Sequence, residues 1–177
     1  MTENYPWYTI VVDSTLRQGD IFFDCSVLVP KGEFSEVEGV TKVKALAVDY
    51  DVIVMSQSCD LEQDNLELVL VCPHWPFSAL AAKFDHFKSN KGKEALLRGH
   101  LPGYHLINRH EVTGPLPEPR VVDFRNVYGV PLEYLKNLCE GNNERLRLLP
   151  PYREHLSQAF ARFFMRVGLP VQVELGK

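Results

Sequence analysis

Two apolar runs separated by one polar segment constrain the fold of this chain most strongly. Residues 51–55 read DVIVM and residues 66–73 read LELVLVCP, whereas the segment 56–65 between them, SQSCDLEQDN, is mostly polar. Apolar runs of this length, flanked by polar residues, are typical of strands buried on both faces of a sheet. Their short separation predicts two antiparallel neighbours joined by a polar loop at 56–65.

Further strands and about three helices are predicted along the rest of the chain. We expect strands at 7–12, 21–29, 42–49, 104–108, 120–124 and 145–149, an edge strand at 171–175, and a loop over the acidic segment 33–44. Apolar residues at three- and four-residue steps predict a helix over 77–87, broken by Gly92. Pro131 is placed to open a short helix that runs to about Cys139.

The C-terminal helix, 151–167, has the clearest helical pattern. Its apolar stripe comprises Tyr152, Leu156, Ala159, Phe160, Phe163, Phe164 and Val167, and Gly168 and Pro170 follow as stop signals. A stripe with three phenylalanines is too apolar to face water. We therefore expect this helix to belong to the core of a single domain, 1–177.

Three segments resemble parts of a known fold. Residues 19–23 (GDIFF), 52–56 (VIVMS) and 68–73 (LVLVCP) are similar to the small SH3-like barrel of PemK/MazF-type toxins. The resemblance covers roughly 17–76. It implies a small SH3-like β-barrel. Together with the strands and helices predicted above, the expected fold is α+β: a small, mostly antiparallel barrel with its core at about 7–76 and 104–149 and about three helices, including the C-terminal helix packed on the barrel. The segments SQSCDLE and FARFFMRVGLP also resemble patterns in uncharacterised bacterial proteins.

The residues that cleave RNA in the toxin family do not carry over to this chain. Where the family has an arginine before the VLV-like strand, this sequence has Tyr50-Asp51. The hydroxyl residue that follows the next strand in the family is displaced here, because His74 to Phe77 precede Ser78. The resemblance therefore implies the barrel and not the nuclease activity.

Composition favours a cytoplasmic protein without a membrane span. Apolar residues make up 45% of the chain, yet no apolar run approaches the roughly 18 residues of a membrane helix, and the N-terminus lacks the pattern of a signal peptide. The cysteines, Cys25, Cys59, Cys72 and Cys139, are expected to be reduced thiols. We expect no cofactor and no metal site, because the predicted hairpin puts Cys59 and Asp60 roughly 20 Å from Cys72 and His74.

The polar loop is the densest cluster of chemically useful side chains. Ser56, Gln57, Ser58, Cys59 and Asp60 supply hydroxyls, an amide, a thiol and a carboxylate directly after a buried strand. Cys59 and Asp60 are candidate catalytic residues, with Cys59 as nucleophile or ligand and a base among His74, His105, His110 and His155. The alternative is a structural turn, in which Ser58 and Asp60 bind backbone amides and Cys59 packs as a small apolar residue.

Charge is unevenly distributed along the sequence. Residues 1–67 contain 4 Lys/Arg and 13 Asp/Glu, whereas residues 68–177 contain 15 and 10. The basic residues gather at 83–98 and 145–166. Arg145, Arg147, Arg162 and Arg166, with the aromatic rings of Trp75 and Tyr152, could bind the phosphates and stack the bases of RNA or DNA. Alternatively, these arginines pair with the acidic first third of the chain.

Three classes of function follow from these observations. The leading hypothesis is a soluble binding or regulatory module associated with nucleic acid through the basic C-terminal half. The second is an enzyme built around Ser56–Asp60. The third is an interaction protein that acts as a homodimer.

Overall fold

The protein has an α+β architecture built on one antiparallel sheet. The computed structural model describes residues 5–63, 65–110, 116–141 and 144–165. Its strands are β1 (Tyr8–Val11), β2 (Asp20–Val37), β3 (Val40–Val54), β4 (Leu68–Pro76), β5 (Tyr104–Ile107), β6 (Arg120–Asp123), β7 (Tyr128–Pro131) and β8 (Arg145–Leu148). Its helices are α1 (Ser58–Glu62), α2 (Phe77–Lys83), α3 (Asn90–Leu97), α4 (Leu132–Gly141) and α5 (Tyr152–Phe164), with a 3-10 turn at Asp85–Lys88. Within the described residues there are thus five α-helices where three were expected.

The two apolar runs form neighbouring strands, as predicted. Residues 52–54 of β3 lie opposite residues 71–73 of β4 in antiparallel register. The polar segment between them is not a plain loop, because it contains the short helix α1. Leu61 is buried on this helix and packs into the core beside β3 and β4. This single apolar side chain in a polar stretch provides the packing that a five-residue helix needs.

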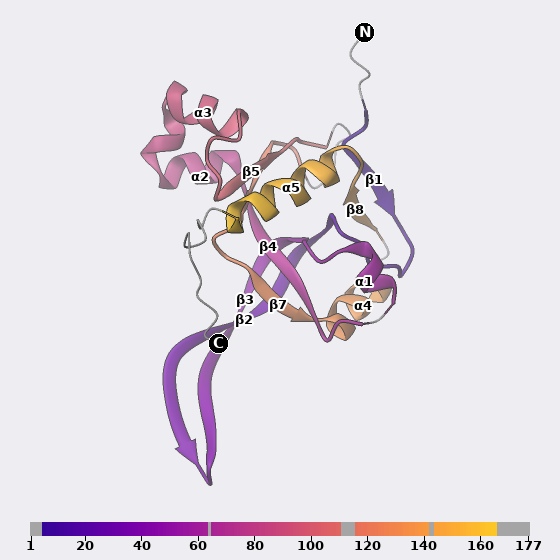
Figure 1. Ribbon diagram of the computed structural model, residues 1–177, viewed down its shortest axis with the longest axis vertical. Coiled ribbons are helices and arrows are strands. Elements are labelled where there is room, and N and C mark those ends of the chain that lie inside the picture. Colours follow the sequence, from indigo (N-terminus) through magenta and orange to yellow (C-terminus); the bar gives the residue numbers. More distant parts are fainter. Residues whose placement is uncertain (1–4, 64, 111–115, 142–143, 166–177) are drawn as a thin grey trace, which may run out of the picture.

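The predicted loop at 33–44 is wrong, because β2 and β3 continue through it as a long hairpin. Residues 28–48, here called the arm, extend away from the body of the protein (Figure 1), and every side chain from 30 to 47 is exposed. The strand predicted at 21–29 also continues through residues 30–32 (Pro-Lys-Gly), where β2 shifts its register against β3 between Pro30 and Phe34. The hairpin turns at Glu38 and Gly39, both at positive φ.

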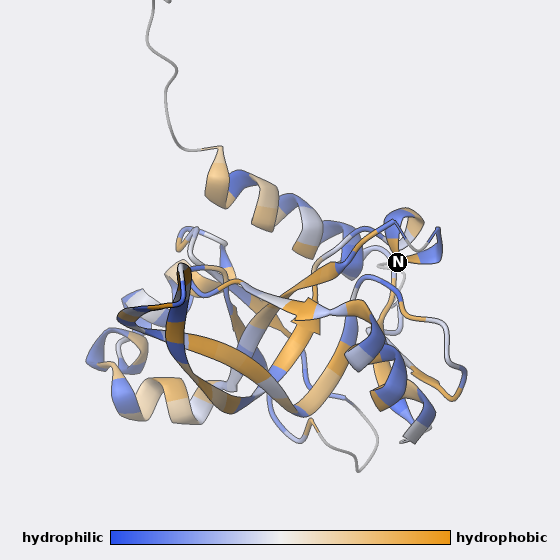
Figure 2. Cartoon of the chain, turned by 90° about the horizontal axis from the view of Figure 1, so that it is seen from below, coloured by the Kyte–Doolittle hydropathy of each residue, from blue (hydrophilic) through white to orange (hydrophobic). Residues whose placement is uncertain are grey.

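Strand β4 holds the sheet together. The order of the sheet is β1-β8-β2-β3-β4-β6-β5, and β7 also pairs with β4. The first half of β4 pairs with β7, and its last three residues, 74–76, pair with β6. The apolar strands gather in the centre of the body (Figure 2). The strand at 128–131 was not predicted, because Gly129 and Pro131 obscure its pattern.

The helical segment after β4 is divided differently from the prediction. The predicted helix 77–87 ends at Phe84, whose backbone is extended (φ −129°, ψ 114°). Gly92 does not break a helix but lies buried inside α3, where an added Cβ would sit only 1.9 Å from the carbonyl oxygen of His86. A residue without a side chain therefore lets α3 pack tightly on the preceding turn.

The C-terminal helix α5 packs on the sheet, as predicted. Leu156 is completely buried, and the rings of Phe160 and Phe163 lie against Phe124 at centroid distances of 5.4 and 6.3 Å. Phe164 does not belong to this buried stripe, since 57% of its surface is exposed. Arg166, Val167 and the predicted edge strand 171–175 lie outside the described residues. None of the described helices is long and apolar enough to cross a membrane.

Candidate ligand-binding surfaces

The polar loop is fixed by hydrogen bonds that its serines accept from the backbone of β4 and of the turn before β2. Ser56 is buried, and its Oγ accepts a hydrogen bond from the backbone N–H of Leu70 at 2.9 Å. The Oγ of Ser58 accepts one from the backbone N–H of Gln18 at 3.2 Å. The amide of Gln57 donates to the Oγ of Ser157 on α5 at 3.3 Å. The loop thus connects the β1–β2 segment, β4 and α5.

Cys59 lies in a polar cleft of about 470 Å³ between α1, the turn at 17–18 and α5. Its lining residues are Arg17, Gln18, Gln57, Ser58, Cys59, Arg153, Glu154, Ser157 and Gln158. The thiol is exposed, and its polar neighbour is the Asp60 carboxylate, 3.8 Å from Sγ. No histidine is among these lining residues. The cleft therefore brings the candidate loop together with two arginines, but not with any of the histidines considered as its base.

The cations of this cleft already have anionic neighbours. Arg17 pairs with Glu62 at 2.8 Å, and Arg153 pairs with Glu154 at 2.7 Å. Their charge is therefore partly neutralised before any ligand arrives.

The other proposed partners of Cys59 lie elsewhere. His74 is completely buried against the edge of the Phe23 ring, and burial, with a smaller contribution from the charge of Arg120, lowers the pKa of its imidazole. Cys72 lies opposite Ile53 on β4 and is completely buried, so it does not line the cleft of Cys59. No group of three His, Cys, Asp or Glu side chains among the described residues is arranged to hold a metal ion.

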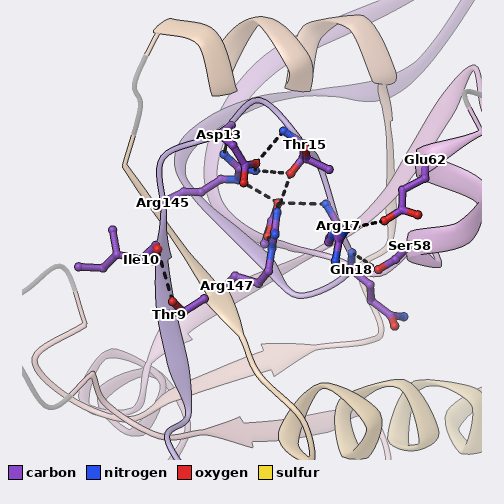
Figure 3. Close-up of polar contacts among 11 residues, drawn as sticks. Thr9, Ile10, Asp13, Thr15, Arg17, Gln18, Ser58, Glu62, Arg145 and Arg147 are labelled. Atoms are coloured by element: carbon purple, nitrogen blue, oxygen red, sulfur yellow. Dashed lines mark hydrogen bonds and ion pairs between the residues drawn. The ribbon is translucent and has the colours of Figure 1, made fainter.

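Arg145 and Arg147 converge on a single buried carboxylate. Both guanidinium groups bind Asp20, whose side chain is fully buried, and Arg145 itself is only 3% exposed. Their remaining donors reach the backbone carbonyls of Asp13 and Thr15 at 2.5 and 2.6 Å, so that both arginines point into the β1–β2 connection (Figure 3). The pair therefore fastens β8 to the acidic N-terminal region, which is the structural alternative stated above.

The other members of the predicted phosphate-binding set are dispersed. Arg162 is exposed on α5, where its Nε donates to the carbonyl of Gln158 at 3.3 Å. Arg166 lies outside the described residues. Tyr152 stacks on Trp7 with ring centroids 3.6 Å apart, whereas Trp75 lines a different pocket.

That second pocket, of about 350 Å³, is lined by the four aromatic rings of Tyr50, Trp75, Phe84 and Tyr128 and is here called the aromatic pocket. Tyr50 of β3 stacks on Tyr128 of β7 with centroids 5.5 Å apart and planes 13° apart. Trp75 of β4 meets Tyr50 edge-on at 5.6 Å and 86°. Burial, with a smaller contribution from Tyr50, raises the pKa of the Tyr128 phenol to about 12.

A preorganised arginine borders the aromatic pocket. Arg125 makes two hydrogen bonds of 2.8 Å to Asp123, and its guanidinium lies 4.3 Å from the centroid of the Tyr104 ring. The side-chain amide of Asn126 also donates to Asp123, at 3.0 Å. Hydrogen bonding to Asp123 raises the pKa of Arg125, which keeps the cation charged. Lys83 of α2 adds a second positive charge to the rim.

The basic cluster predicted at 83–98 adjoins this pocket, because α2 contributes part of its lining. Over 77–100 the chain carries five Lys/Arg, namely Lys83, Lys88, Lys91, Lys93 and Arg98, and two Asp/Glu, Asp85 and Glu94. Asp85 pairs with Lys88 and Glu94 pairs with Arg98. Lys91 and Lys93 are exposed on α3, so the helical segment presents a net positive surface.

Sequence reasoning missed the aromatic pocket because its parts come from four separate segments: β3, β4 with α2, β6 with the turn after it, and β7. Trp75 was singled out, but with Tyr152 and the C-terminal arginines as its companions.

No protein-family model matches this chain, and neither a curated protein nor a solved structure matches it.

Proposed function

We propose that this protein is a binding module for single-stranded nucleic acid, with one base held in the aromatic pocket. The observation that carries the proposal is the fixed guanidinium of Arg125 beside the rings of Tyr50, Trp75 and Tyr128. Aromatic faces stack bases of any sequence, and nearby cations bind the phosphates of the same strand. RNA and DNA share these two features, so the proposal covers both.

The charge of the pocket argues against a cationic ligand. Perpendicular aromatic rings with a carboxylate also suit a quaternary ammonium group. Here both oxygens of Asp123 are already occupied by Arg125 and Asn126. Because Asp123 pairs with Arg125, Lys83 leaves the pocket lining with a net positive charge, so an anionic ligand with a flat aromatic part fits the pocket better than a cation.

We propose the same scaffold as the toxin resemblance implies, a small SH3-like barrel in a cytoplasmic protein. Two features support this scaffold: β4 pairs with β3 and also with β7, and β7 contacts β2 on the far side of β3. The aromatic pocket would then lie at one end of the barrel, beside the helical segment 77–97.

The test is fluorescence anisotropy with labelled 15-mers of dT and of rU at low salt. We expect binding that weakens as salt rises. Trp75→Ala should weaken it about five- to 150-fold, because stacking on an aromatic ring is worth about 1–3 kcal/mol per base. Trp7→Ala is the matched control, since Trp7 stacks on Tyr152 outside the pocket.

A second variant tests the pocket independently, in case Trp75→Ala does not fold. Arg125→Gln removes a half-exposed cation and should weaken binding, and circular dichroism with urea unfolding checks that the chain still folds without the Arg125–Asp123 pair. If wild-type protein binds neither 15-mer at low salt, or if both pocket variants bind as tightly as wild type, the proposed function is wrong.

A further inference from the structure

One wall of the aromatic pocket continues outward as one face of the arm. Tyr50 belongs to β3, and both register shifts of the hairpin add residues to β2, so β3 alternates without interruption from 40 to 54. Successive strand residues point to opposite faces. The even-numbered residues of β3, together with the β2 residues opposite them, therefore share the face of Tyr50, which is here called the Tyr50 face.

Charge is segregated between the two faces of the arm. On β3, Lys42 and Lys44 lie on the Tyr50 face, whereas Asp49 lies on the opposite face. On β2, Glu36 pairs with Thr41 and so lies with Asp49. The Tyr50 face thus carries two lysines, one of which pairs with the Glu33 carboxylate, whereas Glu36 and Asp49 lie on the opposite face.

We propose that the Tyr50 face of the arm is the continuation of the nucleic-acid site, where Lys42 and Lys44 bind phosphates of the strand whose base occupies the aromatic pocket. This inference rests on the proposed function above and extends it to a longer ligand. The aliphatic side chains of Leu46 and Val48 lie between the lysines and Tyr50 on the same face, and Leu46 is 44% exposed. Val48 is half-buried, and the β2 residues Cys25 and Val27 on this face are buried in the core, so the uncharged path for the strand runs along β3.

The spacing sets a minimum length for the ligand. At about 3.3 Å per strand residue, Lys44 lies about 20 Å and Lys42 about 26 Å from Tyr50. A mononucleotide in the pocket cannot reach them, whereas a strand of several nucleotides can. Such a length falls within the range of roughly 4–16 nucleotides that a small single-strand-binding barrel covers.

The existing partner of Lys44 does not block this role. Glu33 lies 3.4 Å from its Nζ, and both side chains are about two-thirds exposed (66% and 69%). An exposed pair of this kind contributes only about 0–1 kcal/mol, so a phosphate can replace the carboxylate.

The experiment compares a trinucleotide, dT3, with dT15 in anisotropy titrations of the full-length chain. The double variant Lys42→Ala/Lys44→Ala should bind dT3 like wild type and dT15 at least five-fold more weakly. Its slope of log K against log salt for dT15 should decrease by about 1.4, because each phosphate contact on a single strand contributes about 0.7. Glu36→Ala, on the opposite face, is the control and should change dT15 binding less than two-fold.

The outcomes separate this inference from the proposed function. If the double variant binds dT15 with wild-type affinity and slope while Trp75→Ala weakens both oligonucleotides, the arm is not part of the site and only the inference fails. If Trp75→Ala and Arg125→Gln change the binding of neither dT3 nor dT15, the proposed function and the inference both fail. If wild type sediments as a dimer that the double variant disrupts, a second copy occupies the arm and the inference is likewise overturned.

Discussion

Removing the charge of Asp20 should destabilise the protein more than any other single loss of a carboxylate. Its side chain is completely buried and accepts hydrogen bonds from the backbone N–H of Arg17 at 3.0 Å and from Arg145 and Arg147. In Asp20→Asn, the guanidinium of Arg145, 3% exposed, loses its buried anion and keeps only the exposed carboxylate of Asp13 at 3.5 Å. Breaking a buried ion pair by removing one partner costs about 3–5 kcal/mol. For a domain of this size that loss corresponds to a Tm about 6–20 °C lower.

The assay is equilibrium unfolding in urea, followed by circular dichroism and by tryptophan fluorescence. Glu94→Gln is the control, because Glu94 pairs with Arg98 on the surface, where both side chains are at least 60% exposed. This exposed pair should contribute no more than about 1 kcal/mol. A loss below about 1 kcal/mol in Asp20→Asn, with an unchanged m-value, would refute the view that this cluster fastens β8 to the N-terminal region.

Two further predictions concern α5 and pH. Leu156→Ala should lower the free energy of unfolding by about 2–5 kcal/mol, because Leu156 is completely buried. Phe164→Ala, at a side chain 57% exposed, should cost less than about 1 kcal/mol, and equal losses in urea unfolding would show that α5 packs differently. Burial lowers the pKa of His105 to about 4, with smaller contributions from the charges of His155 and Arg162. Because the unfolded chain then binds a proton that the folded chain does not, His105 should contribute a loss of stability of up to roughly 3 kcal/mol between about pH 6.5 and pH 4, to which the buried His74 adds. Unfolding curves across this range should show a smaller fall in His105→Asn, and an identical fall would contradict the assignment.

The local sequence pattern was sufficient to predict those elements whose packing depends on residues close together in the chain. The hairpin of β3 and β4 follows from two apolar runs with few residues between them, since antiparallel strands need only a short connection. Helix α5 follows from its 3.6-residue stripe, although the stripe alone could not show that Phe164 lies beyond the edge of the sheet. The arm was missed because Pro30 and Gly32 usually end strands, and an irregular register absorbs them in this hairpin.

The candidate site shows why side-chain chemistry alone could not place a function. Arg145 and Arg147 alternate along a strand as residues of a phosphate-binding face would. Whether they face solvent depends on Asp20, which is 125 residues from Arg145 in sequence and pairs with it inside the protein. The sequence around Trp75 does not indicate which residues lie beside it. Tyr50, Arg125 and Tyr128 come close to Trp75 only through the pairing of β4 with β3, β6 and β7.

The sequence by itself determined which segments are strands and helices over most of the chain, and that the basic residues lie largely after residue 67. Hydrophobic periodicity and turn residues act between near neighbours, and for that reason they can be read from one chain. Only the tertiary structure decided which arginines pair with Asp20 inside the protein and which one lies beside the aromatic pocket. The physical reason is that the desolvation and pairing of a charge depend on residues far away in sequence, which strand order brings into contact.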